Sequence, residues 1–247
     1  VYNPDFHPYK KQDYQGVKIQ HIYSPQNYLG SAASNFVFDY LSLKHAVKHK
    51  FDIILELGLI TAAPAIIFCN KGSSIIVTNL DGLEWKRAKW SPAIRSITKW
   101  LEKFGVRNSN YLVSDNIAIH DYIKDRYNTD SEFIAYGADE VSDLRIQTIE
   151  KYLIKKRDFT LTIARIEPEN NLELMCDAYL SSNSELPYYI IGNHKTKYGE
   201  VLKSKYKDTN IHFLGAIFNK EELDTFRFFA TLYLHGHSVG GTNPALI

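Results

Sequence analysis

Small and polar residues gather at the C-terminal end of the sequence, directly after an apolar run. The stretch HGHSVGGTNPALI (235–247) combines two histidines, a glycine pair and Asn-Pro. The run before it, Thr231–Leu234, predicts a buried strand, and Ala245–Ile247 predicts the first turn of a helix. A strand, a glycine-bearing turn and a helix N-terminus commonly hold an anion, because backbone N–H groups and the helix dipole face it. The spacing therefore predicts a phosphate-binding turn.

Four residues of this turn are the candidate phosphate ligands. Gly240 and Gly241 allow backbone conformations that other residues avoid, so the chain can approach a ligand closely. Thr242 and Asn243 can cap the helix that follows. A plain tight turn is the alternative interpretation of the glycine pair.

Arg165 is the candidate for binding the charge of a diphosphate. It follows the apolar run Phe159–Ala164, which predicts a strand. A guanidinium at a strand end can form charge-assisted hydrogen bonds to phosphate oxygens. The alternative is a surface ion pair with Glu167 or Glu169.

Asp81 and two histidines are further candidates. Asp81 ends a predicted strand, so it is expected to face the site, although an Asp-Gly turn is the alternative. His235 and His237 point the same way on an extended chain, and His237 is expected to bind a sugar hydroxyl. No third metal ligand is evident beside them and the sequence has no Asp-x-Asp, so no metal site is expected.

The segment Lys86–Arg107 carries seven basic residues against one acid, with three tryptophans in or beside it. Lys86, Arg87 and Lys89 open this segment. A basic helix with tryptophans can lie on an anionic membrane surface, so these three residues are predicted to contact a membrane or an acceptor. An ordinary solvated face is the alternative.

Composition limits the class of protein. The 247 residues are 45% hydrophobic, enough for one large core or two moderate ones, and the net charge of +1 argues against a nucleic-acid binder. Cys69 and Cys176 lack the spacing of a metal site and are expected to be free thiols of a reducing compartment. The longest apolar stretch, near Ile60–Cys69, is too short to span a bilayer.

Strand-like and helix-like segments alternate along the chain. Apolar, β-branched runs such as Asp52–Leu57 and Ser74–Leu80 predict buried parallel strands, and Pro92–Arg107 predicts a long helix. The polar stretch Asp139–Asp158 interrupts the alternation, which then resumes. The pattern predicts an α/β protein of two doubly wound, Rossmann-like domains, 1–138 and 139–247.

Four blocks of the sequence together resemble a known family. They are DGLEWKRAKW (81–90), YGAD (136–139), ARIEPENN (164–171) and HGHSVGGTNP (235–244). In this order they look like the signature blocks of retaining, nucleotide-sugar-dependent glycosyltransferases of the GT-B fold, in a bacterial rhamnosyltransferase-like branch of glycosyltransferase family 4.

The resemblance implies a function and a set of site residues. It implies transfer of a sugar, in this branch rhamnose, to a carbohydrate or lipid-linked acceptor in surface-polysaccharide synthesis, without a cofactor, in the cytoplasm or at the inner face of the membrane. Asp81 would act near the acceptor or the reacting carbon. The donor would contact eight residues: Arg165, Asn170, Gly192, His237, Gly240, Gly241, Thr242 and Asn243.

Two positions depart from the family pattern. Asn170 stands where many relatives have Lys, and Gly240 stands where many have Glu. The family's opening strand with its glycine-rich loop finds no match, and the sequence ends before the Glu that binds the donor's ribose. Residues 1–247 alone are therefore expected to bind nucleotide weakly and to transfer no sugar.

Two other classes compete with a transferase. A nicotinamide oxidoreductase would need a Gly-x-Gly-x-x-Gly string after a strand, which the sequence lacks. A non-catalytic nucleotide- or sugar-binding module of the same fold remains the alternative, because Asn170 and Gly240 replace residues that relatives use.

Overall fold

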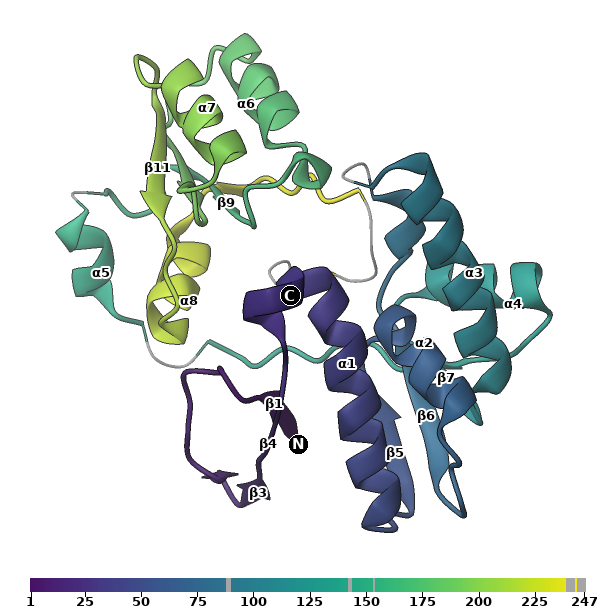
Figure 1. Cartoon of the computed structure of the whole chain (residues 1–247). Helices are drawn as coiled ribbons and strands as arrows, with labels where there is room; N and C mark the ends of the chain where they lie inside the picture. Colours follow the sequence, from purple (N-terminus) through teal and green to yellow (C-terminus); the bar gives the residue numbers. More distant parts are fainter. Residues whose placement is uncertain (88–89, 142–143, 153, 239–242, 244–247) are drawn as a thin grey trace. The chain divides into compact units, whose positions relative to one another are not determined.

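The computed structural model describes residues 1–87, 90–141, 144–152, 154–238 and 243 (Figure 1). The chain divides into two compact units, Val1–Ala135 and Tyr136–Ile247. Each unit contains a four-stranded parallel sheet with helices between the strands. The predicted α/β class, with a parallel sheet in each half of the chain, is confirmed.

The first unit has a sheet in sequence order, with all neighbours parallel. Its strands are β5 (Ile53–Glu56), β6 (Ile75–Leu80), β7 (Tyr111–Ser114) and β8 (Glu132–Phe133). Because parallel strands run the same way, their carboxyl ends meet at one edge of the sheet, where ligands bind in folds of this kind. Asp81 directly follows β6 and therefore lies at that edge.

Four helices complete the first unit: α1 (Gln26–Lys48), α2 (Leu59–Phe68), α3 (Pro92–Asn108) and α4 (Ile117–Tyr127). Ser91 and Asn116 cap α3 and α4 by accepting from the backbone N–H groups of Ile94 and Ala118. Two cores form on the covered face of the sheet, one around Ile66 and Ile76 and one around Leu80, Leu112 and Ile123. The predicted long helix from Pro92 is confirmed.

The second helix contains a proline beyond its first turn. α2 begins at Leu59, and Pro64 lies inside it. A proline at this position removes the hydrogen bond to the carbonyl of Ile60. The helix forms because Ala62, Ala63 and Ile66 are completely buried, and this packing outweighs the lost hydrogen bond.

The prediction that strand β5 is buried on both faces is wrong. Ile54 is 7% exposed, but its neighbours Ile53 and Leu55 are 64% and 58% exposed. Successive side chains of a strand point to opposite faces, and β5 lies at the edge of its sheet. Only the face that carries Ile54 packs against helices of this unit.

The N-terminal segment forms short strands apart from the main sheet. β1 (Tyr2–Pro4) pairs with β4 (Gln20–Ile22), and β2 (Asp13–Tyr14) forms a hairpin with β3 (Val17–Lys18). The segment 17–22 is therefore divided between β3 and β4.

The second unit has the strand order β11-β10-β9-β12, again with all neighbours parallel. Its elements, in chain order, are α5 (Ile146–Lys151), β9 (Thr160–Ile163), α6 (Leu172–Ser181), β10 (Tyr188–Ile191), α7 (Lys197–Lys205), β11 (Ile211–Gly215), α8 (Lys220–Phe229) and β12 (Leu232–Tyr233). Phe159, Tyr188 and Phe226 are among its fully buried side chains. β9 and β12, the strands that precede the third and fourth blocks, are neighbours.

In the described part of the chain, no helix is both long enough and apolar enough to cross a bilayer.

Two half-buried carboxyl groups, Asp39 and Glu56, lie near one another in the first unit. Burial and, to a smaller extent, the nearby Asp39 carboxylate raise the pKa of Glu56 to about 7. Burial also raises the pKa of Asp39 to about 6, against the opposing effect of a hydrogen bond from Thr61. Both groups therefore hold protons in the folded protein that the unfolded chain releases at lower pH.

We expect the free energy of unfolding to decrease as the pH rises. A carboxyl whose pKa is higher in the folded than in the unfolded protein stabilises the fold at pH values below its unfolded pKa. This stabilisation is lost as the pH rises from the unfolded pKa to the folded pKa. Replacing Glu56→Gln removes this group, so the variant should gain stability relative to the natural protein between about pH 5 and pH 7 and level off above. Urea unfolding at a series of pH values measures this difference. The exposed Glu132→Gln is the control, and equal pH profiles for Glu56→Gln and the natural protein would contradict the prediction.

Candidate functional site

The loop after β9 carries the third block and turns sharply into α6. It contains a short 3-10 turn, η2 (Pro168–Asn170), and Asn171 in the left-handed conformation with φ of 49°. Asn adopts this conformation more readily than most residues because its short polar side chain can bond locally. The loop thus places Arg165 and Asn170 at the carboxyl end of β9.

Asn170 joins this loop to the C-terminal block. Its side chain is 4% exposed, and its Nδ2 donates to the carbonyl of Arg165 at 2.6 Å. Its Oδ1 lies 2.8 Å from Nδ1 of His237, 67 residues away in sequence. Since Oδ1 can only accept, Nδ1 of His237 carries the proton, and Nε2 is the acceptor nitrogen of the neutral ring. The tautomer suits a ring that accepts a hydrogen bond from a hydroxyl.

Three more hydrogen bonds hold the two loops together. Nδ2 of Asn171 donates to the carbonyl of Gly236 at 2.7 Å. The backbone N–H and the hydroxyl of Ser238 both donate to the carbonyl of Glu169, at 3.1 and 2.9 Å. Together with the Asn170–His237 bond, these contacts fix residues 235–238 against residues 169–171.

Gly236 makes this close approach possible. A Cβ atom at this position would lie 2.6 Å from the carbonyl oxygen of Asn170 and 3.1 Å from the side chain of Met175. Gly236 and Asn171 were not predicted as site residues. The Asn-Asn pair before a helix was the one sequence signal that could have pointed to Asn171.

The strands beneath the loops are tied by a buried hydroxyl. Thr162 Oγ1 on β9 donates to the carbonyl of Leu234 at 2.8 Å and accepts from the hydroxyl of Tyr188 at 2.7 Å. Burial raises the pKa of Tyr188, so its hydroxyl keeps the proton that it donates. The ends of β9, β10 and β12 are therefore fixed relative to one another.

Gly192 lies at the end of β10, next to the same loop. Its N–H donates to the carbonyl of Gly215 at 2.9 Å, and a Cβ atom here would collide with the carbonyl of Ala164. His194 follows, with Nε2 3.2 Å from Nζ of Lys203, and burial together with Lys203 and Lys195 lowers the pKa of its ring. The structure thus brings Arg165, Asn170, Gly192 and His237 to one end of the second sheet.

Arg165 lies at the rim of this group. Its side chain is 64% exposed, and its guanidinium is 3.8 Å from the carboxylate of Glu167. An exposed pair at this distance contributes little to stability. The predicted ion pair with Glu167 exists, yet it leaves the guanidinium accessible to a ligand.

Of the four predicted turn residues, 240–243, the structure describes one. Gly240, Gly241 and Thr242 lie outside them, whereas Asn243 is described and half-buried. Glu169, on the neighbouring loop, is 7% exposed, and its Oε1 has no hydrogen-bond partner in the described part of the chain.

The first unit carries the remaining candidates. Asp81 is exposed directly after β6, and Lys86 is exposed in the 3-10 turn η1 (Glu84–Lys86). Arg87 forms an ion pair with Glu84 at 2.8 Å, and the Trp90 indole donates to the same carboxylate at 2.8 Å. Lys89 lies outside the described residues. The predicted role of these residues toward an acceptor or a membrane stays a prediction.

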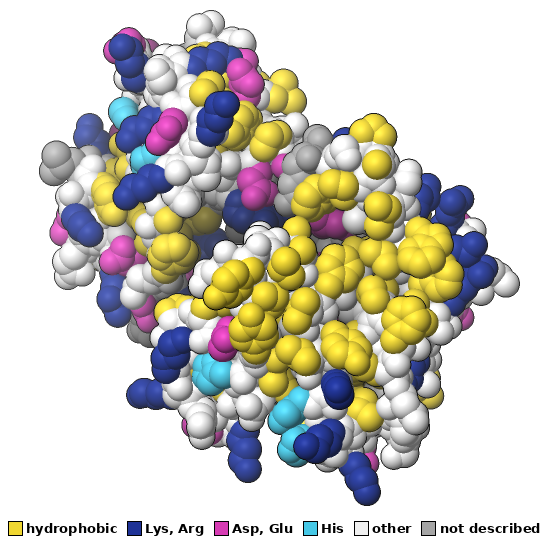
Figure 2. All heavy atoms as spheres, in the orientation of Figure 1, with side chains coloured by type: hydrophobic (Ala, Val, Ile, Leu, Met, Phe, Trp, Pro, Cys, Tyr) yellow, Lys and Arg dark blue, Asp and Glu magenta, His cyan; other side chains and the backbone are white. Residues whose placement is uncertain are grey.

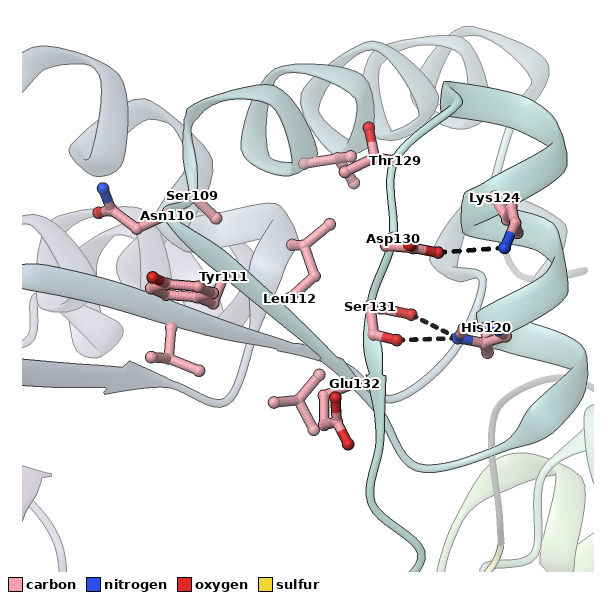
Figure 3. Close-up of a pocket in the computed structure, with 13 residues that line it drawn as sticks. Ser109, Asn110, Tyr111, Leu112, His120, Lys124, Thr129, Asp130, Ser131 and Glu132 are labelled. Carbon is pink, nitrogen blue, oxygen red and sulfur yellow. Dashed lines mark hydrogen bonds and ion pairs between the residues drawn. The ribbon is translucent and has the colours of Figure 1, made fainter.

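A pocket of about 640 Å³ in the first unit lies away from these candidates (Figure 3). It is lined by the start of β7, by α4 and by the residues before β8. Its polar side chains bond one another: Lys124 pairs with Asp130 at 3.3 Å, and His120 Nδ1 lies 2.9 Å from the carbonyl of Ser131. Because the pocket opens at the amino ends of the strands, it does not match the ligand-binding edge of this fold.

Among the described residues, no cluster of three or more His, Cys, Asp or Glu side chains could hold a metal ion. His235 and His237 have ring centroids 6.1 Å apart and tilted planes.

Solved structures share this architecture at low sequence identity. Sucrose-phosphate synthase from Thermosynechococcus elongatus matches with a TM-score of 0.72 and 12% identity over 94% of this chain and 63% of its own. Anabaena HepE, solved with UDP-glucose, matches with a TM-score of 0.67 and 13% identity over 89% of this chain and 60% of its own. A UDP-N-acetylglucosamine 2-epimerase from Rickettsia bellii matches with a TM-score of 0.54 and 12% identity over 83% of this chain and 57% of its own. This chain spans less than two thirds of each of them.

The chain therefore has the GT-B fold of two Rossmann-like domains, as sequence analysis predicted. It belongs to the family described as "Domain of unknown function (DUF1972)", which matches residues 3–139. The matched region corresponds to the first unit. No curated protein matches the chain in sequence.

We expect Gly236→Ala to destabilise the second unit and to displace the two loops. The added methyl group meets backbone at 2.6 Å, and overpacking of this kind typically costs about 1–3 kcal/mol. Chemical unfolding measures the loss. Gly137→Ala in the same unit is the control, because a Cβ atom there has no neighbour within 4 Å. Equal stability of the two variants would show that the loops do not need this close approach.

Proposed function

We propose that the protein is a glycosyltransferase that takes a sugar from a nucleotide-sugar donor and passes it to a carbohydrate or lipid-linked acceptor. The second unit binds the donor, and the first unit provides the acceptor side. In this proposal Asp81 acts near the acceptor hydroxyl or the reacting carbon.

One observation carries the proposal. Arg165 and His237, from blocks about seventy residues apart in sequence, meet at the carboxyl ends of adjacent strands through the buried side chain of Asn170. An accessible guanidinium suits a diphosphate, and a neutral imidazole with an acceptor nitrogen suits a sugar hydroxyl. A nucleotide sugar presents both groups on one molecule.

The structural neighbours are consistent with this donor class. HepE was solved with UDP-glucose and with UDP and glucose. The 2-epimerase shows that the same architecture also serves an enzyme of another reaction, so the fold by itself does not choose the reaction.

Asn170 favours one competing function, a binding module without transfer. The side chain at the position where relatives carry Lys is a buried amide used within the protein. A transferase that lacks this Lys must stabilise the leaving diphosphate with Arg165 and the backbone of the following turn. A module that only binds the nucleotide sugar has no such requirement.

Rhamnose as the sugar, retention of configuration, surface polysaccharide as the product and a lipid-linked acceptor rest on the sequence resemblance. They remain predictions, as do a cytoplasmic location and the inactivity of residues 1–247 alone.

We expect a nucleoside diphosphate to bind and NAD not to bind. The anion-binding groups favour a diphosphate, and the dinucleotide fingerprint is absent from the sequence. Calorimetric titration with UDP, dTDP, GDP and NAD tests this expectation. Tighter binding of NAD than of every nucleoside diphosphate would refute the donor assignment.

A transfer assay separates the two functions. Incubation of the full-length protein with several nucleotide sugars, dTDP-rhamnose included, and with saccharide acceptors should release nucleoside diphosphate and form a longer saccharide. Nucleotide-sugar binding without release, across these donors and acceptors, would favour the binding module.

We expect Arg165→Ala to weaken nucleoside diphosphate binding by roughly 10- to 150-fold, since a hydrogen bond to a charged group contributes about 1.5–3 kcal/mol. Arg165→Lys should recover part of this loss, because an ammonium cannot make the planar two-pronged contact. Arg145→Ala is the matched control: it removes another exposed arginine of the second unit, paired with Glu221 at 3.5 Å. Normal binding by Arg165→Ala, or equal losses in both variants, would contradict the assignment.

A further inference from the structure

Helix α3 exposes a line of large apolar side chains. Ile94, Ile97 and Trp100 are 40%, 57% and 56% exposed, and their spacing of three residues places them on one side of the helix. The ring of Phe104 lies against Trp100, with centroids 4.3 Å apart. We call Ile94, Ile97, Trp100 and Phe104 the α3 stripe. The buried side of the helix carries Thr98, Leu101, Gly105 and Val106 instead.

Basic residues run along the α3 stripe. Arg95, Lys99, Lys103 and Arg107 follow one another at intervals of four, which forms a second line beside the apolar one. Lys103 and Arg107 are exposed, and they lie three residues after Trp100 and Phe104 respectively. The one acid of the helix, Glu102, is 1% exposed and accepts from Tyr122 and Tyr127 at 2.6 and 2.5 Å. No carboxylate of α3 therefore offsets the positive charge at its surface.

The neighbouring helices continue the apolar surface. Figure 2 shows hydrophobic side chains over the face of the first unit that α1, α2 and α3 form, with Lys and Arg at the margin beside α3. Tyr28 on α1 and Phe68 on α2 are 84% and 79% exposed. A continuous exposed apolar surface with a basic margin is typical of an interaction site.

Of the three tryptophans in or beside the basic segment, Trp100 is the exposed one. The Trp90 indole donates to Glu84, and the Trp85 ring packs in the core with Nζ of Lys99 4.2 Å from its centroid. Lys86 and Arg87 therefore stand beside tryptophans that are engaged within the protein. Trp100 is the one whose ring is more than half accessible.

We propose that α3 docks the protein on an anionic membrane surface, with the α3 stripe in the boundary between headgroups and acyl chains and with Lys103 and Arg107 on the headgroups. A 17-residue helix is about 25 Å long, so the stripe can lie flat in the interface without crossing it. The charge of the helix selects this occupant, because a basic line without an exposed acid complements anionic phosphates. The surface belongs to the first unit and does not depend on the donor site.

Vesicle co-sedimentation with the full protein tests the proposal. Vesicles of phosphatidylcholine with phosphatidylglycerol should bind the protein, and vesicles of phosphatidylcholine alone should bind it much more weakly. The double variant Ile97→Ser/Trp100→Ser should lose at least about tenfold in affinity. Lys103→Gln/Arg107→Gln should lose about fivefold for each charge, and added salt should reduce this difference.

A matched control removes apolar side chains from the other unit. Leu174→Ser/Val201→Ser replaces two side chains on α6 and α7 that are 68% and 59% exposed, and it should bind vesicles like the natural protein. Circular dichroism and urea unfolding confirm that each variant is folded.

Quenching by brominated lipids locates the contact. Trp100→Phe should still bind vesicles but lose most of the quenching, because Trp85 and Trp90 are held within the protein. The proposal is overturned if the natural protein does not bind phosphatidylglycerol vesicles, or if the stripe variant binds as well as the control. It is also overturned if sedimentation shows a dimer that the stripe variant abolishes, since a second copy would then cover the stripe.

Discussion

One buried amide holds the candidate site together. The ladder between β9 and β12 consists of two residue pairs, Thr160 with Leu232 and Leu161 with Tyr233. Beyond these pairs, the segments that follow β9 and β12 are joined mainly by side-chain hydrogen bonds. Asn170 is the centre of this arrangement, because its two ends satisfy a backbone carbonyl on one loop and an imidazole on the other. A buried amide that left either end unpaired would cost more than it contributes.

The two hydrogen bonds of residue 170 require an amide side chain. An ammonium group has three donors and no acceptor, so Lys at this position could not accept the N–H of His237. The amide instead fixes the tautomer of His237 and the path of residues 235–238. Arg165, which lies exposed at the rim, provides a positive charge at this end of the sheet.

In the first unit, carboxyl groups are shielded from solvent while large apolar side chains are exposed. Glu102 is buried and Asp39 and Glu56 are half-buried, and all three have raised pKa values, mainly because loss of solvent disfavours their charged forms. The surface of this unit in turn carries exposed apolar side chains on β5 and on α3. Turning acids inward and apolar groups outward costs stability, so the exposed groups point to contacts of this unit with something other than water.

The sequence by itself determined the class of fold and most of the elements. Apolar runs of four to six residues, separated by helical periods, specify parallel strands. The helices over 92–108 and 172–181 follow from periodicity, and Ser91 caps the first of them. The signature blocks also placed Arg165, Asn170 and His237 after predicted strands, where the structure has them. Local chemistry is sufficient for such statements.

Tertiary structure decided which residues touch and which faces are covered. The contacts of Asn171 with Gly236 and of Ser238 with Glu169 join segments more than sixty residues apart, and no local pattern encodes such pairs. Pro64 lies within α2 because burial of its neighbours outweighs its cost to the helix. The apolar spacing of Ile94 and Ile97 fitted a buried face equally well, and only the packing of α3 against α2 shows that they remain exposed. Periodicity reveals that a helix has an apolar side, but it cannot say what covers that side.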